Sequence, residues 1–205
     1  MTICLAWWSS TVSSRAMKSP SAFIIKLPKK FKDKITVAGQ ELELVNKFQE
    51  FENRYMEAEI VSVPVAWETG AKPGDTLYFH HHVVLNSHYS LGDDLYFVPF
   101  HPKAGRNNLA NAYASGDKFV PLGCWVFLEP MESSRKITSA LLEIVQDDVQ
   151  NDRGRVWGVS EELEEMGVTK GDVVYFSKNS DYEMEVEGKK LWRMVTDDLL
   201  YAETK

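Results

Sequence analysis

The residues of this chain best suited to chemistry are its five histidines, three of which are consecutive. His80, His81 and His82 follow a run of alternating apolar residues, and His88 and His101 lie nearby in the sequence. Imidazole is the commonest metal ligand in proteins, and on a strand His80 and His82 would share one face because side chains alternate. The spacing therefore raises the hypothesis of a metal site.

The sequence around the histidines argues against that hypothesis. The pattern Gly-x5-His-x-His that ends at His82 resembles the first half of a cupin metal motif, but Ser87 and His88 stand where its glutamate is expected. The second half of the motif, with its Pro-Gly and histidine, is absent from residues 106–205. A related stretch at 177–179 reads Ser-Lys-Asn. We therefore expect turn histidines exposed to solvent and no bound metal, with a metal-dependent cupin-like enzyme as an alternative.

Other catalytic patterns are missing from the sequence. The two cysteines, Cys4 and Cys124, have neither metal-ligand nor redox spacing and do not indicate a disulfide framework. No P-loop and no pairing of a nucleophile with a base is recognisable. We expect a protein that is not an enzyme, needs no cofactor and resides in a reducing compartment.

Two copies of one hexapeptide organise the elements that would position these residues. Gly-Asp-Thr-Leu-Tyr-Phe at 74–79 returns as Gly-Asp-Val-Val-Tyr-Phe at 171–176. Such a segment predicts a tight turn that leads into a half-buried strand. The neighbouring segments also recur in one order and at nearly constant spacing, namely 23–28 with 125–130, 58–63 with 154–159 and 92–96 with 188–192. The sequence therefore predicts a duplicated domain.

Composition restricts the class of protein and its partners. The chain has 205 residues, a formal net charge of −7 and 44% hydrophobic residues, as expected for a soluble globular protein of one or two domains. The acidic balance argues against nucleic acid as the principal partner, because phosphate binding needs clustered Lys and Arg. No stretch is long and apolar enough to span a bilayer. We expect a cytoplasmic protein that binds neither nucleic acid nor membrane.

The first 22 residues differ in composition from the rest. They are rich in serine, contain no Asp or Glu, and carry an apolar patch at 4–8. A transit peptide would have this composition, which would place the protein in an organelle. A true start at Met17 is the alternative. In either case we expect residues 1–21 to lie outside the fold.

The first repeat is expected at residues 22–105. Many short runs with turn signals between them predict a small β-barrel, with strands at 23–27, 58–65, 76–85 and 94–98. The polar segment that follows the first strand contains a predicted hairpin at 34–39 and a predicted helix at 44–51. Residues 106–118, rich in Gly, Asn, Ala and Ser, are expected to be a linker or an extended terminal loop.

The second repeat is expected at residues 119–205. A strand at 124–128 is followed by a long polar insertion, which we define as a loop at 133–152, with an apolar centre at 141–145. Five aliphatic residues of this segment, at 137, 141, 142, 145 and 149, also have helical spacing. The insertion is therefore either an exposed loop or an amphipathic helix packed on the barrel.

Four segments of the second repeat occur in the order of a known family. They are Val-Pro-Leu-Gly at 120–123, Arg-Gly-Arg-Val-Trp-Gly-Val at 153–159, Val-Thr-Lys-Gly-Asp-Val-Val-Tyr-Phe at 168–176, and the closing strands at 191–194 and 197–202. In these segments the chain resembles GroES-type co-chaperonins, the lid subunits of chaperonins. The resemblance covers 119–204 well and 22–105 more weakly.

The resemblance implies an all-β protein made of two tandem GroES-like small β-barrels. It also implies subunits joined in a ring, and a mobile loop after the first strand that docks on a GroEL-type chaperonin while protein clients fold inside. The docking residues carried over from the family are Leu141, Leu142, Ile144 and Val145, although Ser139-Ala140 replaces the usual Gly-Gly. The equivalent segment of the first repeat offers Ile35 and Val37 as a secondary candidate.

Two questions stay open at the level of the sequence. A structural or assembly module that kept the barrel and lost chaperonin binding is the main functional alternative, since a fold does not fix a function. A divergent double barrel would suit a bacteriophage, and hence the host cytoplasm, or an organelle.

Overall fold

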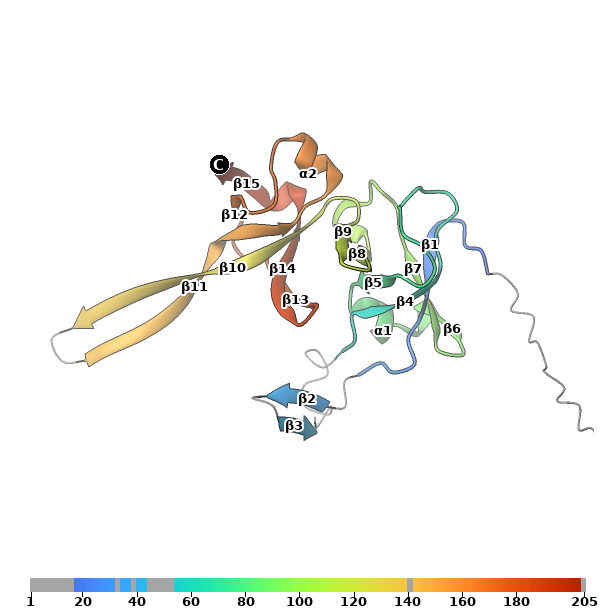
Figure 1. Ribbon diagram of the computed structural model, residues 1–205, viewed down its shortest axis with the longest axis horizontal. Helices are drawn as coiled ribbons and strands as arrows, with labels where there is room; N and C mark the ends of the chain where they lie inside the picture. The colour runs from blue at the N-terminus through green and yellow to red at the C-terminus, as the bar shows by residue number, and fades with distance from the viewer. Residues whose placement is uncertain (1–16, 32–33, 38–39, 44–53, 140–141, 204–205) are drawn as a thin grey trace, which may run out of the picture.

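The computed structural model describes residues 17–31, 34–37, 40–43, 54–139 and 142–203. This part of the chain is all-β, with two antiparallel sheets, a separate two-stranded hairpin and only short helical turns (Figure 1). Among the described residues, no helix has the length and hydropathy needed to cross a bilayer.

The first unit is built on a seven-stranded antiparallel sheet with the order β6-β7-β1-β4-β5-β8-β9. Short apolar or alternating runs bounded by turn residues form its strands. These are β1 (Ala22–Lys26), β4 (Glu57–Ser62), β5 (Thr76–Phe79), β6 (Ser90–Gly92), β7 (Leu95–Pro99), β8 (Ala110–Ser115) and β9 (Lys118–Pro121). Helical turns α1 (His82–Leu85), η1 (Ser87–Tyr89) and η2 (Gly105–Asn107) connect them. The predicted hairpin is confirmed as β2 (Lys34–Val37) and β3 (Gln40–Glu43), whereas the helix expected at 44–51 lies outside the described residues.

The second unit is built on a six-stranded antiparallel sheet with the order β13-β14-β10-β11-β12-β15. Its strands are β10 (Trp125–Ser139), β11 (Leu142–Gly158), β12 (Val173–Phe176), β13 (Tyr182–Val186), β14 (Lys189–Val195) and β15 (Leu199–Glu203). Two short helices, α2 (Glu161–Glu165) and η3 (Thr196–Asp198), lie between strands. Ser160 caps α2, because its hydroxyl accepts a hydrogen bond from the backbone N–H of Leu163.

Both sheets have the same strand order. If the strands of each sheet are counted along the chain, six strands of the first sheet and all six of the second read 4-5-1-2-3-6. Strand β9 is the additional strand at the edge of the first sheet, and β2–β3 is inserted between its first and second strands. The segments that recur in the sequence therefore occupy equivalent places in the two sheets.

The two Gly-Asp turns also have the same backbone geometry. Gly74 has φ +93° and Gly171 has φ +97°, in a region that L side chains rarely adopt. Each glycine N–H donates to a carbonyl of the preceding sheet strand, Gly74 to Ile60 and Gly171 to Val156, both at 2.8 Å. Glycine is thus needed at both positions for the turn that starts the third strand of each sheet.

Several sequence-based boundaries need correction. Residues 110–115, expected in a linker or terminal loop, form β8, which pairs with β5 and β9 inside the first sheet. Ala and Asn favour strands weakly, so pairing with the neighbours determines this strand rather than local preference. Residues 119–121, assigned to the second repeat, belong to β9, which pairs with β8 at the edge of the first sheet. The fold also begins earlier than residue 22, since Ser19 and Pro20 accept backbone hydrogen bonds from Val65 and Ala66.

The expected closed barrels are not formed by the described strands. The first sheet ends at β6 and β9, and the second ends at β13 and β15, with no pairing between the two edges of either sheet. Edge strand β13 places Met184 and Val186 in an apolar cluster shared with the first unit.

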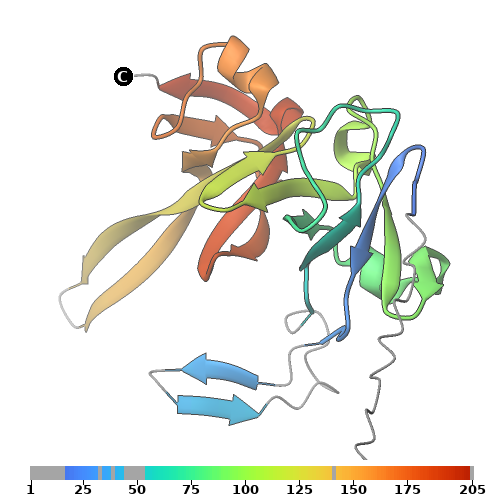
Figure 2. The same ribbon diagram turned by 45° about the vertical axis from the view of Figure 1, so that its right-hand side comes forward.

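The described residues form three apolar clusters. One lies within the first unit around Phe23, Ile60, Leu77 and Phe79, and another lies within the second unit around Val126, Val174 and Phe176. The third joins the units and contains Tyr78, Ala112, Trp125, Phe127, Met184, Val186, Leu191 and Val195. We call this contact between the two units the seam. Figure 2 shows the units side by side, with the β10–β11 hairpin extending away from both.

Strand β9 and one ion pair complete the seam. The ring of Phe119 lies 5.5 Å from that of Tyr78 in the first unit and 4.9 Å from that of Phe127 in the second. Arg106, in η2, forms an ion pair with the buried Asp198 of η3. The seam is therefore an apolar core with polar contacts at its margin, so the two units pack as one body.

Candidate functional site

Among the described residues, the distal part of the β10–β11 hairpin extends farthest from the two sheets. Near its base, Trp125–Leu128 pairs with β14 and Arg153–Arg155 pairs with β12. Beyond a register shift near Pro130, the two strands pair with each other from Glu132–Val149 to Ser139–Leu142. We call residues 132–139 and 142–149 the arm; Figure 1 shows it extending well beyond the sheet.

The arm contains most of the residues predicted to dock on a chaperonin. Leu142, Ile144 and Val145 lie in β11, where the register pairs them with Ser139, Ile137 and Lys136. Leu141 lies outside the described residues. The segment is neither an irregular loop nor the alternative packed helix, because it forms a ribbon of two antiparallel strands. Its β-branched residues favour this conformation.

The secondary candidate lies at the equivalent place in the first unit. Ile35 and Val37 belong to β2, and the register pairs them with Leu42 and Gln40 of β3. Both hairpins connect the first and second sheet strands of their unit. The structure therefore gives each unit a hairpin at the position of the predicted docking loop, and the hairpin of the second unit is the longer.

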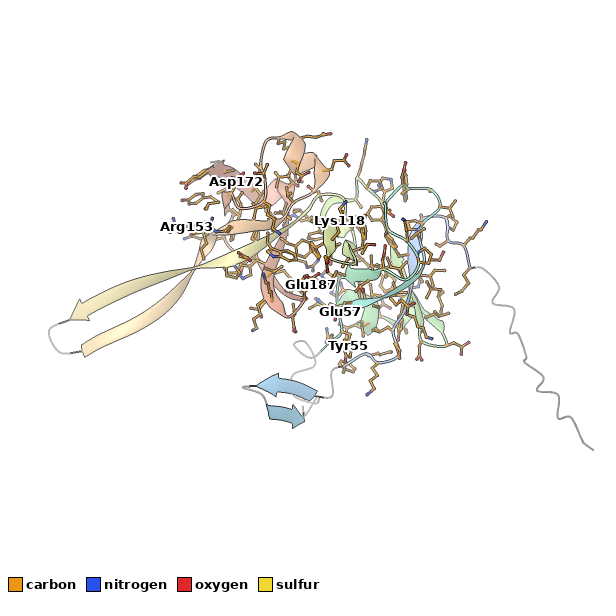
Figure 3. The ribbon with its side chains drawn as sticks, viewed as in Figure 1. Tyr55, Glu57, Lys118, Arg153, Asp172 and Glu187 are labelled. Atoms are coloured by element: carbon orange, nitrogen blue, oxygen red, sulfur yellow. The ribbon has the colours of Figure 1, made fainter. Side chains whose placement is uncertain are left out.

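Aromatic and charged side chains lie at the base of the arm, and the sequence analysis did not identify them. The rings of Tyr175 and Tyr201 stack with centroids 4.3 Å apart, and a guanidinium nitrogen of Arg153 donates to the Tyr175 hydroxyl at 3.3 Å. That hydroxyl donates to Glu203 at 3.1 Å. These residues come from β11, β12 and β15, and Figure 3 labels Arg153 at this point.

Strand β15 leaves one edge of the second sheet unpaired among the described strands. Two large residues on it are exposed, Leu200 at 65% and Tyr201 at 57% of their surface. An edge strand with free backbone groups and exposed apolar side chains is suited to pairing with another chain.

The three consecutive histidines lie at the seam rather than on a strand. Strand β5 ends at Phe79, His81 is the residue before α1, and His82 begins that helix, so the strand expected at 76–85 begins as predicted but stops at residue 79. Ring nitrogens of the three histidines lie within 4.8 Å of one another. His80 and His81 are partly buried, which corrects the expectation of turn histidines fully exposed to solvent.

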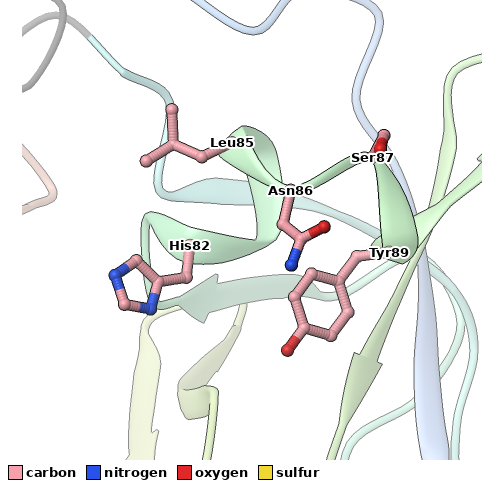
Figure 4. A pocket seen from close by; sticks show the side chains of 5 residues that line it. All are labelled: His82, Leu85, Asn86, Ser87 and Tyr89. Atoms are coloured by element: carbon pink, nitrogen blue, oxygen red, sulfur yellow. The ribbon is translucent and has the colours of Figure 1, made fainter.

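The other two histidines lie apart from this cluster. His88 packs against Phe97, with ring centroids 5.6 Å apart, and His101 packs against Trp67 at 4.6 Å. His82 instead lines a shallow pocket of about 410 Å³ beside α1, together with Leu85, Asn86, Ser87 and Tyr89 (Figure 4). This lining has no carboxylate and no pairing of a nucleophile with a base.

Residues of the second unit surround the cluster. The ring of His81 stacks on that of Tyr182, with centroids 5.5 Å apart and planes at 9°, and its Nδ1 is hydrogen-bonded to the Tyr182 hydroxyl. The guanidinium of Arg193 lies 4.2 Å from the centre of the Tyr182 ring and 4.7 Å from that of Trp125. Burial lowers the pKa of Arg193 to about 10, although the Tyr182 hydroxyl opposes this effect.

The chemistry of the cluster is a poor fit for a cation. His80 Nδ1 lies 3.2 Å from the backbone N–H of His82 and accepts its hydrogen, so the neutral ring carries its proton on Nε2. Arg193 acts electrostatically on both His80 and His81, and Arg54 acts on His81. A metal ion here would be repelled by guanidinium groups and would find one imidazole already engaged.

The half-buried Cys124 does not supply an alternative nucleophile. Burial raises the pKa of its thiol, so the reactive thiolate is disfavoured at neutral pH. With the histidines engaged in packing and the thiol protonated, the arm remains the strongest candidate for a functional surface.

Comparison with known proteins identifies one family. Residues 118–202 match the family model for the chaperonin 10 Kd subunit. The matched segment begins with β9, contains the whole second sheet apart from the last residue of β15, and includes the arm. It covers less than half of the chain. No curated protein matched the sequence in a separate comparison.

Proposed function

We propose that this chain is a co-chaperonin that caps the cavity of a GroEL-type chaperonin and so encloses a protein client. The observation that supports this most is the match of residues 118–202 to the chaperonin 10 Kd subunit family. Proteins of that family are chaperones and not enzymes, in keeping with a function that needs no catalytic group of its own.

The first unit is proposed to be a divergent duplicate of the second. The shared strand order and the equivalent hydrogen bonds of the two Gly-Asp turns support this origin. A duplicated co-chaperonin would carry two docking hairpins in one chain. Such a protein would act in the cytoplasm, and its divergence suits a bacteriophage or an organelle.

The arm is proposed to dock on the chaperonin through Leu141, Leu142, Ile144 and Val145. Burial of four aliphatic side chains contributes about 1.5–3 kcal/mol each, and ordering of irregular backbone costs about 1–2 kcal/mol per residue. In the described part of the arm the backbone is already paired, so less of that cost remains at docking. Ile35 and Val37 of β2 are proposed as a weaker second contact.

Several arms acting together would give firm but reversible capping. We propose that subunits join in a ring and that the exposed edge of β15, with Leu200 and Tyr201, contributes to the contact between chains. Arms held on one ring bind with a high effective concentration, so weak single contacts combine. Each contact can still separate when the chaperonin changes state.

Two measurements test this proposal. The mass of the native assembly should correspond to several copies of the chain. A GroEL-type chaperonin should retain the protein in a pull-down with nucleotide, and release it when the nucleotide is removed. A protein that assembles but is never retained by chaperonins with any nucleotide would contradict the proposal and favour an assembly module.

A further inference from the structure

We propose that the seam is an acid-labile joint, which opens when His80 and His81 become protonated below neutral pH. The two imidazoles come from the first unit, between β5 and α1, and the groups that cover them come from β13 and β14 of the second. Charge placed on these rings therefore acts directly on the contact between the units.

The imidazoles are packed into the seam by Tyr182. The ring centroids of His80 and Tyr182 are 5.6 Å apart with planes at 30°, and those of His81 and Tyr182 are 5.5 Å apart with planes at 9°. The hydrogen bond between His81 Nδ1 and the Tyr182 hydroxyl further fixes this stack. The Tyr182 hydroxyl is also 3.9 Å from the sulfur of Met56 in the first unit.

Two permanent cations already lie beside these rings. Arg193 and Arg54 are each only 2% exposed, and both act electrostatically on His81 and Tyr182. Arg193 is held between the Trp125 and Tyr182 rings, and within the described chain no carboxylate forms an ion pair with it. A proton on either imidazole would add positive charge to a low-dielectric region that already contains buried guanidinium groups.

Two acidic groups act on Tyr78, which also belongs to the seam cluster. Burial first, and then Glu57 and Glu187, raise the pKa of Tyr78 to about 12, and Glu57 also accepts a hydrogen bond from its hydroxyl. Glu57 comes from β4 and Glu187 from the turn between β13 and β14, and both are labelled in Figure 3. The remaining charged neighbour of the two imidazoles is His82, whose protonation would add to the repulsion.

The sign of the pH effect follows from the direction of the shifts. Burial, followed by Arg193 and the two other histidines, lowers the pKa of His80 to about 3, and burial with His82, Arg54 and Arg193 lowers that of His81 to about 4. In separated units both imidazoles would titrate near their ordinary pKa of about 6.5. The open form therefore binds more protons, and the closed form loses stability as the pH falls from about 6.5 towards about 4.

Opening the joint would uncouple the two hairpins, because β2–β3 belongs to the first unit and the arm to the second. This consequence for docking rests on the proposed function. The existence of the joint does not rest on the proposed function, and it can be tested in the free protein without a chaperonin.

Hydrogen exchange of the intact chain tests the joint. Amide exchange in β5, β13 and β14 is measured at about pH 7.5 and about pH 5, and corrected for the intrinsic pH dependence of exchange. We expect exchange in these strands to increase by about tenfold or more at the lower pH, while β1 and β7 in the outer part of the first sheet remain protected. Unchanged protection of the seam strands, or loss of protection that is equal everywhere, would overturn the proposal.

Three variants separate the imidazoles from other acid-sensitive groups. The double substitution His80→Gln, His81→Gln should remove most of the difference between the two pH values. His81→Lys places a lasting charge in the seam and should increase exchange there at pH 7.5, whereas His88→Lys, at an exposed position, should not. A double variant that retains the full pH response would overturn the proposal.

A titration of the wild-type histidines by NMR covers the case in which a variant does not fold. Two of the five histidines should titrate well below about 6.5, and their titration should coincide with the rise in exchange at the seam. If all five titrate near that value while the seam strands stay protected, the proposal is wrong.

Discussion

Asp75 and Asp172 occupy equivalent places in the two Gly-Asp turns but differ in their surroundings. Asp75 Oδ2 accepts from the backbone N–H of Lys72 at 2.8 Å. Asp172 Oδ2 accepts from the backbone N–H of Thr169 at 2.8 Å and also from its hydroxyl at 3.0 Å. Asp172 is 4% exposed, whereas the bond of Asp75 lies at the surface.

Replacement of the buried aspartate should therefore cost more. We expect Asp172→Ala to lower the free energy of unfolding by about 2–3 kcal/mol, because the backbone N–H and the hydroxyl of Thr169 both lose a buried acceptor. Asp75→Ala, the matched control, should cost about 0.5–1.5 kcal/mol, since water can replace its carboxylate. Urea denaturation of both variants measures the difference, and equal losses would contradict this account of the turns.

The histidine cluster is predicted not to hold a metal required for function. The guanidinium groups of Arg54 and Arg193 oppose a cation at this place, and His80 Nδ1 is engaged with the backbone of His82. Protein purified without an affinity tag should contain no stoichiometric metal in elemental analysis. His82→Ala should keep its fold and the chaperonin binding that we propose for the wild type; loss of that binding in a folded variant would reverse the conclusion.

At the scale of the elements, the arm is distinctive because its two strands pair with each other and with no other described strand of the sheet. Beyond Leu128 in β10 and Arg153 in β11, towards the tip of the hairpin, the two strands no longer pair with β14 and β12 and continue as a pair. We expect a ribbon that projects beyond the sheets to contribute little to the cores of the two units. Function and stability should therefore be separable in the arm.

A double substitution in the arm tests this separation. Leu142→Ser with Ile144→Ser should leave the melting temperature nearly unchanged and abolish chaperonin binding, because each arm loses about 3–5 kcal/mol of apolar contact and the loss is multiplied over the ring. Thr138→Ser with Glu143→Ser, a register pair in the same ribbon, is the control and should still bind. A large fall in melting temperature would instead mean that the two aliphatic residues are packed in a core, where such truncations cost about 2–5 kcal/mol each.

At the scale of the whole molecule, the seam makes the two units of the proposed duplication depend on each other. Each unit has its own apolar cluster, but Phe127, Met184 and Leu191 of the second unit are buried in the cluster shared with Tyr78 and Ala112 of the first. The fold is thus two similar sheets that complete each other, and neither half buries all of its apolar surface alone.

A fragment of residues 119–205 tests this dependence. We expect it to keep its strands, since β10 to β15 pair among themselves, but to melt at a lower temperature than the full chain because the seam cluster is exposed. Circular dichroism measures both quantities, and dye binding should report the exposed surface. A fragment as stable as the full chain would show that the seam contributes nothing to the fold.

Local pattern was sufficient to predict most strands and the recurrence of their order. The Gly-Asp hexapeptides predicted β5 and β12 because a turn that requires positive φ and an alternating run are both encoded within a few residues. The order of short motifs also predicted the co-chaperonin family that residues 118–202 match. These features depend on neighbours in the sequence, which are visible without the fold.

The features decided by tertiary structure all depend on residues far apart in the chain. Strand β8 has little strand preference of its own and exists because β5 and β9 pair with it, and β13 buries Met184 and Val186 in a cluster shared with the other unit. His81 meets Tyr182, a hundred residues away, only when the units are in contact. Local propensity contains no information on such contacts, because burial, pairing and electrostatic neighbours are set by packing between segments that the sequence keeps apart.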